Sequence, residues 1–178
     1  MFPLTSLSPY PIVSVIDEPP HLTIGPLMIW IHRRAYPFID DWCDRNWLMS
    51  TCSITIGEET ILLSGSDAAS DELSEFCMAL QRLRDREDRS AAYYPSSQTV
   101  LIDVMQADDD GFALTLRHLN GGRVECEATR SDLRRWIAEL QAILHIFPRM
   151  TSRIAIGQPY GSPSAPEHLA PQLDPKIL

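Results

Sequence analysis

The sequence lacks the long apolar runs, basic clusters and glycine-rich loops that mark several classes of protein. No apolar run reaches the roughly 18 residues that a membrane-spanning helix needs. Acidic residues outnumber basic ones by 24 to 15, for a net charge of -9, which argues against binding to nucleic acid. Only eight residues are glycine, so a phosphate-binding loop is not expected. We therefore expect no membrane or nucleic-acid partner, and an acidic surface that suits a basic protein.

Cysteine is scarce as well, with four residues and no CxxC pair. Three of the four lie in apolar periodic segments, which favours small buried side chains over disulfides. The first twenty residues carry no basic stretch and are interrupted by prolines, so a signal peptide is not expected. These features indicate a reduced, cytoplasmic protein.

Proline divides the chain into three parts. Residues 1–20 are rich in Pro and Ser and are expected to form an irregular arm. Residues 151–178 hold five prolines and two glycines, a composition that sustains neither a helix nor an inner strand. The sequence thus predicts a single domain over 21–150, followed by a Pro-rich tail.

Two segments of this domain share one plan. Residues 52–83 and 112–144 each show a strand, a tight turn, a second strand, a polar cap and an amphipathic helix. The turns are expected at 57–58 and 120–122, where Gly and Asn tolerate positive φ. Asp67 or Ser70 is expected to cap the first helix, and Thr129 or Ser131 the second.

Apolar residues recur along both helices at intervals of three and four, as one buried stripe requires. In the second strand pair, Phe112, Leu114 and Leu116 are expected to share the apolar face of the first strand. On the next strand, Glu125 and Glu127 alternate with apolar residues and are expected to face water. The sequence therefore predicts an α+β fold in which two β-β-α units form one antiparallel sheet, with both helices on one face. The expected stripes are Leu73, Phe76, Cys77, Leu80 and Leu83, then Leu133, Trp136, Ile137, Leu140, Leu144 and Phe147.

The stretch DDWCDRNWL, residues 40–48, gathers carboxylates that a hard cation could use. The central glycine and terminal glutamate of a calcium loop are missing from it, so no metal or other cofactor is expected. A structural corner is the simpler interpretation, with the polar side chains bonded to nearby backbone groups. In this interpretation Asp44 and Asn46 hold the turn, while Trp47 and Leu48 begin a strand.

Catalysis has little support in the sequence. A nucleophile–base pair would need a histidine beside a serine or cysteine, and His32 and His118 lie on predicted strands that could meet. However, no serine lies in a G-x-S-x-G turn and no cysteine carries a catalytic signature. We expect no enzymatic activity, and keep a small hydrolase that uses this histidine pair as an alternative.

Exposed acidic groups are the better candidates for function. These groups lie in predicted loops and on the solvent-facing side of a strand. Their negative charge would attract a positively charged protein and so raise the rate of association. The residues expected to contact a partner are Asp40, Asp41, Asp108, Asp109, Asp110, Glu125 and Glu127.

The segment RAYPFIDDWCDRNWL, residues 34–48, resembles the WapI family, the immunity proteins of bacterial polymorphic, contact-dependent toxins. Members have an acidic and aromatic stretch followed by Asp-x-Asn-Trp-Leu, which matches Asp44, Asn46, Trp47 and Leu48. The β-β-α plan and the closing helix, which ends in an aromatic-Pro pair, extend the resemblance over about residues 27–150. Arg45 departs from the pattern, because a small residue is expected there.

The resemblance implies an antitoxin-like protein of bacterial competition. Such a protein binds the C-terminal domain of its cognate toxin, for example a basic nuclease, and blocks it stoichiometrically without catalysis. The alternative from another class is an adaptor or secretion-associated chaperone that uses the Pro-rich tail for docking.

Overall fold

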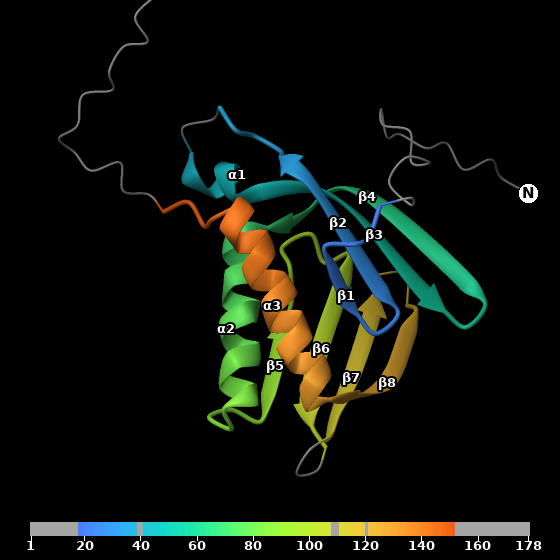
Figure 1. Ribbon diagram of the computed structural model, residues 1–178. Helices are drawn as coiled ribbons and strands as arrows, with labels where there is room; N and C mark the ends of the chain where they lie inside the picture. The colour runs from blue at the N-terminus through green and yellow to red at the C-terminus, as the bar shows by residue number, and fades with distance from the viewer. Residues whose placement is uncertain (1–17, 39–40, 108–110, 120, 152–178) are drawn as a thin grey trace, which may run out of the picture.

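The computed structural model describes residues 18–38, 41–107, 111–119 and 121–151 (Figure 1). Most of the predicted arm and nearly all of the predicted tail lie outside these ranges, so the division of the chain stays a prediction. The elements follow the order β1 (Leu22–Ile24), β2 (Leu27–Arg34), α1 (Trp42–Asn46), β3 (Trp47–Ile56), β4 (Glu59–Ala69), α2 (Ser70–Arg84), β5 (Ser90–Tyr93), β6 (Val100–Gln106), β7 (Gly111–His118), β8 (Arg123–Thr129) and α3 (Arg130–Ile146).

The strands form two antiparallel sheets. Sheet A has the order β1-β2-β3-β4 and sheet B the order β5-β6-β7-β8, and each sheet is followed by a long helix. The α+β class and the plan of two similar units are therefore confirmed. The prediction of a single sheet is wrong. Each unit has four strands rather than two, and helix α2 separates β4 from β5 along the chain. Strands that follow one another in the sequence pair within a unit, so each unit forms a sheet of its own.

Glycine allows the two sheets to touch. Gly25 has φ +54 in the β1–β2 turn, and a Cβ there would lie 2.9 Å from Leu114 Cδ2 and 3.0 Å from Cys126 Sγ. The first turn of sheet A therefore rests on strands β7 and β8. At a second contact, a Cβ on Gly122 would lie 2.5 Å from Ile56 Cδ1. A larger residue at Gly25 would also be strained by the positive φ, whereas at Gly122 the end of the Ile56 side chain would have to shift.

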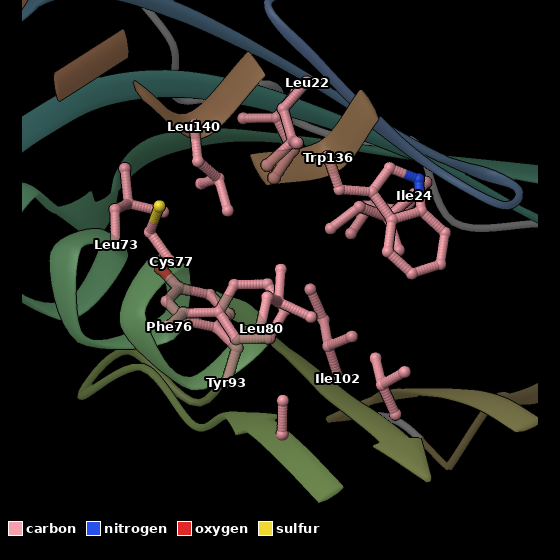
Figure 2. Packing of buried hydrophobic residues seen from close by; sticks show 14 of the residues in the cluster. Leu22, Ile24, Leu73, Phe76, Cys77, Leu80, Tyr93, Ile102, Trp136 and Leu140 are labelled. Carbon is pink, nitrogen blue, oxygen red and sulfur yellow. The ribbon is translucent and has the colours of Figure 1, made fainter. Parts of the chain in front are cut away.

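Helices α2 and α3 lie side by side and close one continuous core (Figure 1). Figure 2 shows Trp136 of α3 next to Leu22 and Ile24 of β1, with Leu80 of α2 on the other side. The predicted stripe of α2 is buried throughout. In α3 the stripe includes Ile143, whereas Leu144 and Phe147 are only half-buried. Residues of both sheets and both long helices contribute to the same buried cluster.

The two long helices begin differently. Thr129 caps α3, as predicted: its hydroxyl accepts from the Asp132 amide, and the Asp132 carboxylate accepts from the Thr129 amide. At α2 the cap position is Ala69, which makes no side-chain cap bond. The prediction that Ser70 caps α2 is wrong, because Ser70 is buried and its hydroxyl donates to Asn46. The side chain of Asp67 lies outside the described part of the structure.

The capping box of α3 should make stability depend on pH. The hydroxyl and amide of Thr129 donate to Asp132 and lower the pKa of its carboxyl. The pKa of Asp132 is thus lower in the folded protein than in the unfolded chain, where it is about 3.9. The carboxylate therefore stabilises the fold fully above about pH 3.9, and this stabilisation is lost as the pH falls through the pKa of the folded state. We expect Asp132→Asn to lower the free energy of unfolding by about 0.5–1 kcal/mol near neutral pH.

Urea unfolding at several pH values would measure this difference. The destabilisation by Asp132→Asn should shrink below about pH 4. Ser131→Ala, at the exposed neighbouring position, should show no such trend. A destabilisation that is constant from neutral to acidic pH would contradict the assignment to the carboxylate.

Candidate partner-binding surface

The segment with the acidic and aromatic motif folds into a corner between β2 and β3. The single turn α1 begins after Asp41, whose carboxylate accepts from the Cys43 amide at 2.8 Å. Partial desolvation and the neighbouring Asp41 carboxylate raise the pKa of the exposed Cys43 thiol, which disfavours a reactive thiolate at neutral pH. Asp44 is half-buried, Trp47 is half-buried and Leu48 is fully buried in the core.

Asn46 bonds to two distant parts of the chain. Its side chain is 0% exposed; Nδ2 donates to the Met150 carbonyl at 3.0 Å, and Oδ1 accepts from the Met150 amide at 2.8 Å. The Ser70 hydroxyl donates to the same Oδ1 at 2.8 Å. Arg34 donates to the carbonyls of Arg45 and Pro148. These bonds tie the corner to the start of α2 and to the segment after α3, so its polar groups serve the fold.

The two histidines of the hydrolase alternative lie in different sheets. His32 is exposed on β2 and its Nε2 lies 3.0 Å from Thr51 Oγ1; desolvation, and then His21, lower its pKa. His118 is buried at the end of β7. The hollow described below is lined by neither of them. The geometry therefore gives the histidine pair no support.

Among the described residues, no group of three or more His, Cys, Asp or Glu could hold a metal ion. In the part of the chain that the structure describes, every helix is too short or too polar to span a bilayer.

The acidic residues predicted to contact a partner separate into two groups. Glu125 and Glu127 are exposed on β8, and Asp41 is exposed at the start of α1. Figure 1 shows α1 and strand β8 at different ends of the molecule. Asp40, Asp108, Asp109 and Asp110 lie outside the described residues.

One face of sheet B points away from the helices, and we call it the outer face of sheet B. The register places Asp103 opposite Thr115 and Thr115 opposite Glu125 on this face. The next row joins Met105, Ala113 and Glu127 in the same way. Side chains at alternating positions, such as Phe112 and Leu114, are buried in the core, as predicted. The outer face also includes Leu101, Arg117 and Arg123, with Tyr94 just after β5.

Tyr94 is held in place although 58% of it is exposed. Its hydroxyl donates to Asp103, and the hydrogen bond to this carboxylate raises the pKa of Tyr94. Arg117 donates to the other oxygen of Asp103 at 2.7 Å, and its guanidinium carbon lies 5.8 Å from the centre of the Tyr94 ring. Met105 is also 58% exposed. Alternation along β6 predicts the outward direction of Met105 and Asp103, but nothing in the sequence indicated that Tyr94 would join them.

Beside this cluster, strands β7 and β8 carry a hollow of about 560 Å³. Small residues of β7, Ala113 and Thr115, form part of its lining, and they stand directly opposite Glu127 and Glu125. On the inner side, the same strands pack against the Gly25 turn, which does not line the hollow. The hollow therefore opens on the outer face of sheet B, with two carboxylates beside it.

A comparison with protein-family models decides the family of this domain. The model described as the immunity protein WapI-like family matches residues 22–148. The chain belongs to this family. No curated protein and no solved structure matches the chain. The resemblance predicted from residues 34–48 and from the two-unit plan is thereby confirmed.

The WapI-like match begins with β1 and ends at Pro148, just after α3. It therefore includes both four-stranded units, the corner at Asn46 and the whole outer face of sheet B. The residues described above as candidate partner contacts on β8 are part of the immunity-family domain and not of an added segment.

Proposed function

We propose that this protein is an intracellular immunity protein that binds a cognate toxin domain and blocks it by stoichiometric, non-catalytic inhibition. The observation that carries the proposal is the match of the WapI-like immunity family to residues 22–148. The outer face of sheet B supports it, because exposed Tyr, Met and Arg side chains are typical anchors of protein interfaces.

The net charge of -9 suits a basic partner, and a nuclease domain is the proposed kind of toxin. Glu125 and Glu127 are the proposed acidic contacts within the described residues. Asp41 is a separate contact, because it caps α1, which lies at a different end of the molecule from β8. Asp40 and residues 108–110 stay in the proposed set on the basis of the sequence alone.

Co-expression with the toxin domain encoded immediately upstream tests the proposal. We expect the two chains to purify as a one-to-one complex, and cells that make both to survive. Because long-range attraction between exposed charges is screened by salt, the association rate constant should fall at least about tenfold between low and high ionic strength. The absence of both a complex and protection would reject the proposal.

A truncation separates this function from the adaptor alternative. A chain that ends after residue 151 retains every residue of the family match. It should protect cells as well as the full chain does. Loss of protection by a truncated chain that still folds would instead favour an adaptor that docks through its Pro-rich tail.

A further inference from the structure

The two sheets differ in how open their outward faces are. On sheet A, Trp30 is 4% exposed and its Nε1 donates to the Glu18 carbonyl at 2.8 Å. Thr51 and Ser53, which alternate with the core residues of β3, are buried too. On the outer face of sheet B, by contrast, Tyr94 and Met105 are both more than half exposed. This face therefore exposes large side chains that can pack against a partner, whereas Trp30 on sheet A is covered.

We infer that the outer face of sheet B is the docking surface for a basic protein, with one of its Arg or Lys side chains seated in the hollow beside Glu125 and Glu127 and an apolar side chain against Tyr94 and Met105. The identification of this partner as the toxin domain rests on the proposed function. The inference itself concerns the surface and the chemistry that fits it.

The hollow suits a basic side chain for two reasons. Ala113 and Thr115 are short, so their cross-strand partners Glu127 and Glu125 rise above them and leave space for an inserted group. Two carboxylates on one strand, two residues apart, can share a guanidinium or ammonium group. Glu125 pairs with Arg123, both side chains are more than half exposed, and such surface pairs contribute little and exchange readily.

The neighbouring cluster provides the apolar half of the surface. Tyr94 is fixed by Asp103 and Arg117, so its ring would lose little conformational freedom on binding. Met105 beside it can adapt to the shape of an apolar partner group. The charged side chains on edge strand β8 disfavour the competing arrangement in which a second copy of this chain adds its own strand.

The first experiment measures the affinity of the full chain for the upstream-encoded toxin domain. Tyr94→Ala should weaken binding about tenfold to a hundredfold. Glu125→Lys combined with Glu127→Lys should weaken it at least about tenfold, mainly through slower association. The matched control is Glu58→Lys with Glu59→Lys, at the exposed β3–β4 turn, which should stay within about twofold of wild type. Thermal unfolding verifies that each variant folds. Unchanged affinity in both outer-face variants would overturn the inference and leave the proposed function standing.

A second experiment does not depend on the toxin. The amide NMR spectrum of the full chain is recorded during titration with a blocked tetra-arginine peptide. Shifts should concentrate at Ala113, Thr115 and the two glutamates of β8, disappear in the Glu125→Lys, Glu127→Lys variant and persist in the control. Shifts elsewhere, or self-association through β8 at the same concentrations, would overturn the inference. If the wild type binds no toxin but shows these shifts, the proposed function fails and the docking surface stands.

Discussion

Trp136→Ala is expected to lower the free energy of unfolding by about 3–5 kcal/mol, the largest effect of any single substitution considered for this protein. Trp136 is 1% exposed and is among the largest of the fully buried side chains. Figure 2 shows it next to Leu22 and Ile24 of β1, where α3 packs against sheet A. Alanine would remove most of the buried apolar area and leave a cavity that three elements would have to close.

Trp136→Phe serves as the control for this prediction. Among the described residues, the buried Trp136 Nε1 has no hydrogen-bond partner. Phenylalanine loses part of the packing but also removes an N–H whose burial costs about 1–3 kcal/mol, so the net loss should be only about 1 kcal/mol. Urea unfolding followed by circular dichroism measures both. Equal losses for the two variants would show that packing around the ring is not what stabilises this site.

Periodicity in the sequence was sufficient to locate most elements. The alternation in β7 and β8 assigned Leu114 and Leu116 to the core and Glu125 and Glu127 to solvent, as the structure has them. The three- and four-residue spacing in α2 gave its whole buried stripe. These patterns are local consequences of burying one face of an element, so a single sequence contains them.

Contacts between distant segments were not predictable in this way. Alternation shows which face of a strand is buried but not where a sheet ends, which is why one sheet was expected and two are present. Strand β5 has only four residues and gave no clear signal. Ser70 looked like a helix cap, but its hydroxyl is bound by Asn46, 24 residues earlier in the chain.

The candidate partner-binding surface likewise has a part that the sequence predicted and a part that it did not. The outward direction of the two glutamates on β8 followed from the sequence. The cluster of Tyr94, Asp103 and Arg117 did not, because it depends on residues of β5, β6 and β7 that meet only when sheet B forms. Composition likewise indicated an acidic protein but could not indicate which face would remain open.

Asn46→Ala is expected to lower the free energy of unfolding by about 2–3 kcal/mol. The side chain makes two hydrogen bonds with Met150 and one with Ser70, and alanine can replace none of them. The groups left behind are partly or fully buried, so water satisfies them poorly. The loss should be measured by urea unfolding, with toxin affinity determined on the folded variant.

Ser70→Ala separates the contributions of the two segments that Asn46 holds. This variant removes the hydroxyl that donates to Asn46 but leaves both bonds between Asn46 and Met150, so it should cost only about 1 kcal/mol. In the double variant the losses should be less than additive, because the two side chains share a hydrogen bond. Since the corner at Asn46 serves the fold and the outer face of sheet B is proposed to bind the partner, Asn46→Ala should reduce stability while the folded protein retains its affinity. A variant that stays fully stable but loses affinity would instead place the family motif in the interface.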